Sequence, residues 1–328
     1  MATTQTPSKP VVGQTFKQLS ERTWKAQAHI IKPWLKEGQS ALIWAGTGVG
    51  KAQLSLTLGL LAAGGGTVAG WSNDRPRKVL IIDGEMRLSE LTERLVGLAK
   101  DIEGLDLDAA KENIEVRARQ DQEPGVEFYD LAVSEDQDAI SKYVRGEGIE
   151  LLILDNITTL TDSIKDENGA ADVKPFLKFL LKMKRDGVAT IALHHANKGG
   201  SSYRGSTGIA TTFEVIMGLQ RPKTAAPSQM VFTLGFEKFR EKRDETLATR
   251  SFELKEYKWT VTEDDESDMA RLVQAIRSCE FTTQQGAGDS LGFSKDKTSK
   301  VLKKAVANGI ITKQQIRDSL EGDLEFAV

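Results

Sequence analysis

The sequence predicts an α/β protein with a doubly wound, mostly parallel sheet, a late antiparallel β extension and a small C-terminal domain. Apolar, strand-like runs alternate with helical patterns from about residue 39 to about residue 222. Several of these runs are apolar at almost every position, which is typical of parallel strands buried on both faces. From about residue 229 the pattern changes to two β segments and then to helices. Because strands and helices alternate strictly in the first part, we expect right-handed crossover units around one sheet.

The expected elements follow in order along the chain. Parallel strands are expected at 41–46, 78–83, 114–120, 150–156, 189–196 and 214–220, and helices at 54–64, 88–102, 136–144 and 172–187. The later β segments are 229–241 and 249–261, joined by a charged turn around Lys242–Thr246. The tail predicts three helices at 269–279, 282–291 and 294–308, and then a short β pair at 310–316 and 324–328. Three helices followed by a β pair indicate a winged helix.

Length and composition are those of a globular protein with more than one domain. The chain has 328 residues, and a prior of roughly 150 residues per domain suggests two domains. Hydrophobic residues make up 39% and charged residues 28%, which excludes collagen-like and wholly disordered chains. We expect a leader and arm at 1–38, a main domain at 39–262, an acidic linker at 263–268 and the winged helix at 269–328. Trp24 and Trp34 in the arm could pack on the core or on a neighbouring subunit.

Charge and cysteine content exclude several classes of function. The 44 basic and 47 acidic residues give a net charge of −3, so any role with nucleic acid needs a local basic patch. The single cysteine, Cys279, forms no internal disulfide and belongs to no zinc-binding cluster. The sequence has neither an apolar run of membrane-spanning length nor a signal peptide, so we expect a cytoplasmic protein without a membrane partner.

The segment 45–52, AGTGVGKA, follows the strand 41–46 and begins a helix. Its glycines let the backbone wrap a phosphate, while the helix N-terminus and Lys51 supply positive potential. The pattern resembles the Walker A P-loop, so we expect ATP with Mg²⁺. The candidate nucleotide-binding residues are Gly46, Thr47, Gly48, Val49, Gly50, Lys51, Ala52 and Gln53. The plain alternative is a glycine-rich turn that binds no ligand.

Two positions depart from the Walker A pattern. Ala45 replaces its first glycine, which is a mild change. Ala52 stands where a Ser or Thr hydroxyl would bind Mg²⁺, and an alanine removes that ligand. The sequence leaves open whether Gln53 or a water replaces the hydroxyl, or whether hydrolysis is impaired.

Acidic residues end two of the expected strands. Asp155 closes the strand 150–156, where a Walker B aspartate would hold Mg²⁺ and its water shell. Glu85 follows the strand 78–83 at the edge beside the phosphate crevice. Asp83 is its rival for a catalytic role, and a solvated loop carboxylate is the plain alternative.

Two histidines end the strand 189–196. His194 and His195 are consecutive, so their side chains point to opposite faces and at most one faces the nucleotide. The parity of the strand does not say which one. The loop that follows is rich in Gly and Ser and carries Lys198 and Arg204. It is a candidate DNA-facing loop, with an ordinary surface loop as the equal alternative.

Basic residues mark two later segments. Lys238 and Arg240 are two apart on an expected strand, hence on one face, where a solvated surface is the competing account. The helix 294–308 is rich in lysine, as a recognition helix for duplex DNA would be. Its candidate DNA contacts are Lys295, Lys297, Lys300 and Lys304. The alternative is a winged helix used for protein contacts.

Residues from about 39 to 261, about two thirds of the chain, resemble the RecA-like ATPase core of RepA-type plasmid and phage replicative helicases, relatives of the DnaB and KaiC groups. The residues that carry this resemblance are Lys51, Glu85, Asp155, His194–His195 and the segment KGGSSYRGS. It implies that Glu85 polarises the attacking water, and that a histidine contacts the γ-phosphate. It also implies that Lys238 and Arg240 reach a neighbouring subunit's phosphate. Lys198 and Arg204 would then face single-stranded DNA in the channel of a ring, expected to be a hexamer.

The sequence therefore predicts an ATP-hydrolysing ring ATPase that acts on DNA, a replicative helicase or loader of a plasmid, phage or other mobile element. The winged helix would bind duplex DNA or a replication partner. The alternative is an ATP-gated DNA-binding regulator with weak or no hydrolysis, which Ala52 favours. A metabolic kinase is disfavoured because no lid with an arginine cluster is evident.

Overall fold

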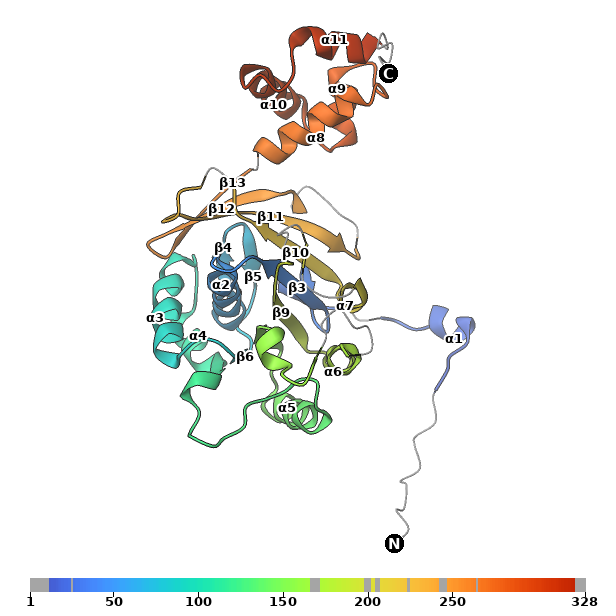
Figure 1. The fold of residues 1–328 in the computed structure, drawn as a ribbon. Coiled ribbons are helices and arrows are strands. Elements are labelled where there is room, and N and C mark those ends of the chain that lie inside the picture. Colours follow the sequence, from blue (N-terminus) through green and yellow to red (C-terminus); the bar gives the residue numbers. More distant parts are fainter. Residues whose placement is uncertain are drawn as a thin grey trace.

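The computed structural model describes residues 12–24, 26–165, 172–197, 202–203, 207–222, 225–241, 247–263 and 265–321. A nine-stranded sheet in the order β13-β12-β11-β10-β3-β9-β8-β6-β7 forms its centre (Figure 1). Its strands are β3 (Ser40–Ala45), β6 (Val79–Asp83), β7 (Ile114–Ala118), β8 (Leu151–Asp155), β9 (Ala189–His195), β10 (Val215–Gln220), β11 (Met230–Phe239), β12 (Arg250–Lys255) and β13 (Lys258–Glu263). Two small hairpins are β1 (His29–Ile31) with β2 (Leu35–Lys36) and β4 (Gly66–Val68) with β5 (Trp71–Asn73).

The helices are distributed along the whole described chain. They are α1 (Phe16–Ser20), α2 (Lys51–Gly64), α3 (Leu88–Leu98), α4 (Leu107–Asn113), α5 (Ser134–Glu147), α6 (Lys174–Arg185), α7 (Thr207–Thr212), α8 (Asp265–Arg277), α9 (Gln284–Ser290), α10 (Lys295–Ala307) and α11 (Lys313–Glu321). Short 3-10 turns are η1 (Ala99–Asp101), η2 (Arg119–Asp121) and η3 (Thr158–Leu160). In the part of the chain described, no helix is both long and apolar enough to span a bilayer.

The sheet confirms the expected mixture of parallel and antiparallel strands. Strands β10, β3, β9, β8, β6 and β7 run parallel, and β11, β12 and β13 continue the sheet as an antiparallel meander. All six parallel strands lie where the sequence predicts them. Five of them are nearly continuous apolar runs, whereas β7 alternates apolar residues with Glu115 and Arg117. The carboxyl ends of β3, β6, β8 and β9 meet at one edge, which is where ligands bind in open α/β sheets.

Helices cover both faces of the sheet, so the strands alternate between two cores. On one face α2, α3 and α4 pack over a core that includes Ile43 of β3. On the other face α5 and α6 pack over a core that includes Trp44, the next residue of the same strand. This alternation decides which residues at the strand ends can face a shared site.

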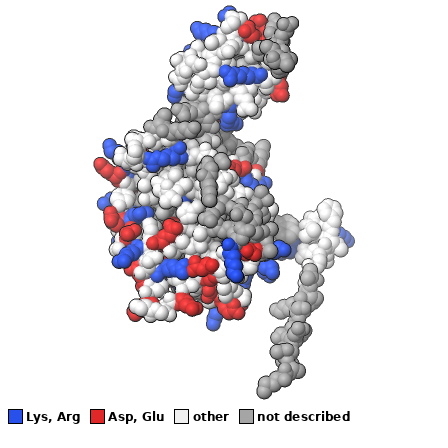
Figure 2. Space-filling view, viewed as in Figure 1, with Lys and Arg blue, Asp and Glu red and all other residues white. Residues whose placement is uncertain are grey.

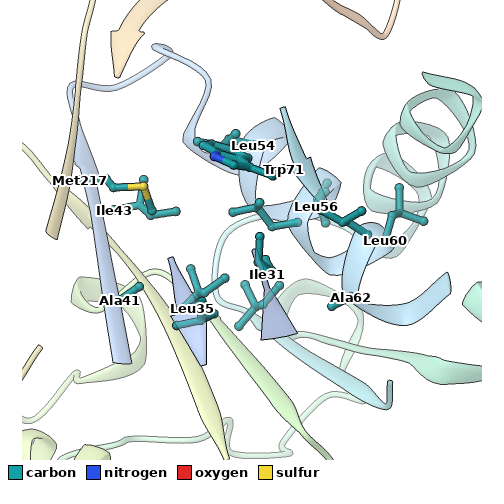
Figure 3. Packing of buried hydrophobic residues seen from close by; sticks show 14 of the residues in the cluster. Ile31, Leu35, Ala41, Ile43, Leu54, Leu56, Leu60, Ala62, Trp71 and Met217 are labelled. Atoms are coloured by element: carbon teal, nitrogen blue, oxygen red, sulfur yellow. The ribbon is translucent and has the colours of Figure 1, made fainter. Parts of the chain in front are cut away.

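The hairpin formed by β1 and β2 packs on the core of the sheet domain. Trp34 is 1% exposed, and its ring lies 5.8 Å from that of Trp71. Figure 3 shows Ile31 and Leu35 of this hairpin beside side chains of the same core. Residues 29–36 therefore join the sheet domain, although the sequence places them in the arm. Trp24 is 61% exposed and lies in the arm that leads away from the domain (Figure 1).

The second late β segment is a hairpin, and its prediction as one strand over 249–261 is wrong. β12 and β13 pair in register, and the turn between them is Glu256–Tyr257 with φ of 50° and 62°. A two-residue turn with positive φ at both positions is the usual hairpin connection, but it normally carries Gly or Asn. Because neither residue occurs at this turn, the sequence pattern predicted one continuous strand. The expected connection at Lys242–Thr246 lies outside the described residues.

The C-terminal segment is helical over its described part, from α8 to α11. The strand predicted at 310–316 is wrong: α11 begins at Lys313. Thr312 and Gln315 form reciprocal hydrogen bonds of 2.9 and 3.1 Å that cap α11. The second predicted strand, 324–328, lies outside the described residues, so a winged helix is not shown. Of the expected acidic linker 263–268, Glu263 ends β13 and residues 265–268 form the first turn of α8.

Candidate functional site

A cleft of about 400 Å³ opens at the carboxyl edge of the parallel strands. Of the predicted nucleotide-binding residues, those that line it are Thr47, Gly48, Gly50, Lys51, Ala52 and Gln53. The predicted residues Glu85, Asp155 and His195 line it from the ends of other strands. Gly46 and Val49 lie beside it, with Val49 packed in the core. The structure thus brings together the P-loop, the two strand-end acids and one histidine.

The backbone of the glycine-rich loop needs its glycines. Gly48 and Gly50 have φ of +73° and +125°, which side chains disfavour. A Cβ on Gly50 would also lie 3.0 Å from the ring of Phe232. Gly50 is the N-cap of α2 and supplies no side-chain cap, so the first amides of α2 keep their capacity to bind an anion.

Lys51 lies at the base of this loop and is 8% exposed. Its Nζ donates hydrogen bonds to the carbonyl oxygens of Ala45 at 3.0 Å and Gly46 at 3.1 Å. Burial lowers the pKa of Lys51, while Asp155 and Glu85 oppose this shift. The lysine is therefore a preorganised donor between the loop and the acidic strand ends.

Asp155 is the buried carboxylate of the cleft. Burial and the nearby Asp83 and Glu85 carboxylates raise its pKa to about 8, and Lys51 only partly offsets them. A carboxylate in this position binds a cation favourably because the cation removes an electrostatic penalty. Asp83 has a different task, since its Oδ1 accepts hydrogen bonds from the backbone N–H groups of Glu85 at 2.8 Å and Met86 at 2.7 Å.

Glu85 is the strand-end carboxylate that remains accessible, with a side chain 46% exposed. Its Oε1 accepts a hydrogen bond from Asn156 Nδ2 at 2.6 Å and lies 3.5 Å from His195 Nε2. Asn156 was missed in the sequence, although a polar residue directly after the strand-end Asp155 is a usable signal. These contacts favour Glu85 over Asp83 as the group that handles a proton.

The two histidines lie on opposite faces of β9, as the period of a strand requires. His195 lines the cleft, 3.2 Å from Asn156 Nδ2. His194 is completely buried beside Trp44, its register partner on β3. Of the two histidines predicted as catalytic residues, only His195 reaches the cleft. The position of His194 does not support a catalytic role.

Comparison with known proteins shows the family of the chain and its fold. A family model described as AAA domain matches residues 6–201. The chain belongs to the AAA domain family. Among solved structures, a KaiC-like protein from the archaeon Pyrococcus horikoshii OT3 is similar with a TM-score of 0.52 and 17% identity, over 72% of this chain and 99% of that chain. The RadB recombinase is similar with a TM-score of 0.47 and 18% identity, over 68% and 90%. No curated protein matches.

The family and the fold confirm the prediction of a RecA-like P-loop ATPase. The AAA domain of this chain has the RecA-like fold of P-loop ATPases. The narrower resemblance to RepA-type helicases remains a prediction.

The basic pair on β11 lies apart from the cleft of this AAA domain. Lys238 Nζ donates to the carbonyl oxygen of Ala210 at 2.6 Å, and Arg240 donates to that of Thr211 at 2.8 Å. Arg240 also pairs with Glu214 at 3.2 Å. Both side chains thus share one face, as predicted, and hold the C-terminal end of α7 within the same chain.

The predicted DNA contacts divide into three groups. Lys198 and Arg204 lie outside the described residues, but α7 shows that the expected long loop ends in a helix. Lys295, Lys300 and Lys304 are exposed on α10. Lys297 instead pairs with the buried Asp268 at 2.8 Å and lies 4.6 Å from the centre of the Phe293 ring. Its role within the C-terminal core was not visible in the sequence.

Arg94 of α3 also lines the cleft and was missed, because no local pattern distinguishes it from other helix arginines. The AAA domain offers the phosphates of a nucleotide a glycine loop, a helix N-terminus, Lys51 and Arg94. For Mg²⁺ it offers Asp155, while Ala52 supplies no hydroxyl. In the described part of the chain no group of three or more His, Cys, Asp or Glu residues could hold a metal ion. A Mg²⁺ ion at this site would therefore be held by Asp155 together with the phosphate oxygens of a nucleotide.

Proposed function

We propose that this chain binds ATP with Mg²⁺, hydrolyses it and acts on DNA as a ring ATPase, as a replicative helicase or loader of a mobile element. The observation that carries the proposal is the joint position of Lys51, Asp155, Glu85 and His195 around one cleft in an AAA domain. Each of these residue types has a separate task in phosphoryl transfer, and the cleft holds one of each.

The tasks follow from the contacts of each side chain. The amides at the start of α2 and Lys51 bind and orient the phosphates. Asp155 would hold Mg²⁺, and the ion would supply positive charge to the phosphate oxygens. Glu85, oriented by Asn156, accepts a proton from the attacking water. His195 lies close to both Glu85 and Asn156.

Self-association into a ring, which we propose to be a hexamer, is supported by the N-terminal arm. Val12, Phe16 and Trp24 are between 61% and 85% exposed on a segment that leads away from the domain (Figure 1). Exposed apolar side chains of this size favour contact with another subunit. Within such a ring we propose that Lys238 and Arg240 exchange their contacts with the α7 carbonyl oxygens for the phosphate of the neighbouring subunit. There they stabilise the charge of phosphoryl transfer.

Contact with DNA is proposed for two segments. Single-stranded DNA would lie in the channel against Lys198 and Arg204, and duplex DNA against Lys295, Lys300 and Lys304 of α10. Figure 2 shows Lys and Arg interspersed with Asp and Glu over the visible face of the sheet domain. The proposed contacts are therefore local, which agrees with the net charge of −3.

The alternative is an ATP-gated DNA-binding regulator, which Ala52 favours because its side chain supplies no hydroxyl for the metal at the start of α2. ATP turnover with and without single-stranded DNA decides between them, together with sedimentation in the presence of a non-hydrolysable analogue. The motor predicts stimulated turnover and an assembly of about six subunits. ATP binding without turnover, with DNA binding that depends on ATP, would establish the regulator. A chain that binds no ATP contradicts both.

We expect Ala52→Ser to raise Mg²⁺-dependent turnover by about tenfold, because the new hydroxyl adds a metal ligand at the start of α2. The measurement is the initial rate of ATP hydrolysis over a range of Mg²⁺ concentrations. Ala52→Thr and Ala52→Val form a matched pair, since their side chains have the same shape and only threonine has the hydroxyl. Equal rates for that pair would show that the hydroxyl is not needed.

A further inference from the structure

Strand β11 contains a bulge at Glu237, directly before the basic pair. Met217 of β10 pairs with Phe236 and Ile216 pairs with Lys238, so Glu237 has no partner residue on β10. A bulge inserts one extra residue and changes the face to which the following side chains point. The bulge therefore bears directly on the direction of Lys238 and Arg240.

The two faces of β11 show this change of direction. Phe232, Leu234 and Phe236 alternate regularly and all pack in the core beneath α2. Without a bulge, positions 238 and 240 would continue on that face. Instead Lys238 and Arg240 contact the carbonyl oxygens at the end of α7, on the opposite side of the sheet.

Glu237 is tied to the strand that begins the P-loop. Its Oε2 accepts a hydrogen bond of 3.0 Å from Nε1 of Trp44 on β3. Trp44 is completely buried, and the carbonyl oxygen of the next residue, Ala45, accepts a hydrogen bond from Lys51. The bond between Trp44 and Glu237 thus connects the strand end that holds Lys51 to the bulge that aims the basic pair.

This bond crosses β10, which lies between β3 and β11, and Gly218 makes the crossing possible. Gly218 is the register partner of Trp44. A Cβ on Gly218 would lie 2.6 Å from Glu237 Oε1 and 2.7 Å from Trp44 Cζ2, closer than real Cβ atoms approach. A glycine at this position in a strand interior marks such a close approach.

We propose that Glu237 is a positioning residue whose hydrogen bond to Trp44 fixes the bulge of β11 and aims Lys238 and Arg240 at the end of α7. Its effect on catalysis rests on the proposed hydrolysis of ATP, whereas its effect on the position of β11 and α7 does not. Helix α7 follows His195 in the chain, so the bond links the strand that leads to the P-loop with the region proposed to face DNA.

The first test is hydrogen–deuterium exchange, which requires no activity. Glu237→Leu removes the acceptor, and Trp44→Phe removes the donor while keeping an aromatic ring. We expect both to accelerate amide exchange in β11 and α7 by about tenfold, the effect of one lost hydrogen bond. Glu237→Gln keeps an acceptor oxygen and should exchange as the wild type does. Glu253→Leu, an exposed carboxylate of β12, is the matched control. Unchanged exchange in Glu237→Leu would overturn the proposal.

The second test separates positioning from a general structural role. We expect Glu237→Leu to lower kcat for ATP by about tenfold without changing KM, because the P-loop itself is intact. Glu237→Gln should restore kcat. If Glu237→Leu lowers kcat and also raises KM, and Glu237→Gln does not restore them, a positioning role is refuted. If the wild type hydrolyses no ATP, the proposed function fails, and the exchange experiment still decides the position of the bulge.

Discussion

Lys51→Met abolishes most ATP turnover, with an expected loss of at least about 100-fold. Methionine keeps the length of the side chain but removes the positive charge and both hydrogen bonds to the Ala45 and Gly46 carbonyl oxygens. The cleft then retains Asp155 and Glu85, with Asp83 nearby, and has less positive charge to balance them, so a triphosphate meets a more negative site. ATP binding, measured by calorimetric titration, should weaken in the same variant.

The matched control is Lys111→Met on α4, where the lysine is exposed and pairs only weakly with Asp108 in the preceding turn. This variant should bind and hydrolyse ATP at the wild-type rate. If Lys51→Met still bound ATP with wild-type affinity and kept its turnover, the cleft would not be a nucleotide site, and the proposed motor and the proposed switch would both be wrong.

The sequence predicts those parts of the fold that local patterns determine. Most of the parallel strands are apolar over nearly their whole length, so their positions were predicted almost to the residue. The P-loop was equally readable, because wrapping a phosphate needs glycines and a lysine at fixed spacing. The strand-end acids Glu85 and Asp155 were found because parallel strands bring their carboxyl ends to one edge.

The errors arise where two local signals compete or where tertiary packing decides. The run Ile310–Thr312 has β-branched residues and suggested a strand, but the reciprocal cap between Thr312 and Gln315 starts a helix there. The hairpin turn at Glu256–Tyr257 lacks the usual glycine. In the first case the sequence contains a helix signal that was weaker than its competitor, and in the second the usual turn signal is missing.

Other features of the site cannot be read from the sequence at all. Which of His194 and His195 faces the cleft depends on where β9 begins relative to the sheet. The contact between Asn156 and Glu85 joins residues far apart in the chain. At the bulge of Glu237 the sequence shows only a change of apolar spacing, from two residues to three between Phe236 and Phe239. It does not show which strand pairs there or in which register. Such features follow from how distant strands pair, which a single sequence does not specify.

Asp155→Asn should stabilise the protein in the absence of nucleotide and abolish its catalysis. Asparagine keeps the shape of the side chain but removes the charge that Mg²⁺ needs, so hydrolysis should fall by at least about 100-fold. The native state also loses a buried charge that lies near Asp83 and Glu85. We therefore expect a higher Tm at pH 8.5, by at least roughly 2–4 °C, the shift that about 1 kcal/mol gives in a domain of this size.

The pH dependence gives the sign of this effect. The pKa of Asp155 is about 8 in the native state against an ordinary value of 3.8, so between these values the native state holds a proton that the unfolded chain has released. The contribution of Asp155 to stability therefore falls as pH rises through this window and is constant above it. The difference in Tm between Asp155→Asn and wild type should grow from about pH 4 to pH 8. Asp108→Asn, at an exposed position, should show no such growth. A Tm difference independent of pH would mean that Asp155 is ionised at neutral pH and that its charge is already balanced within the protein.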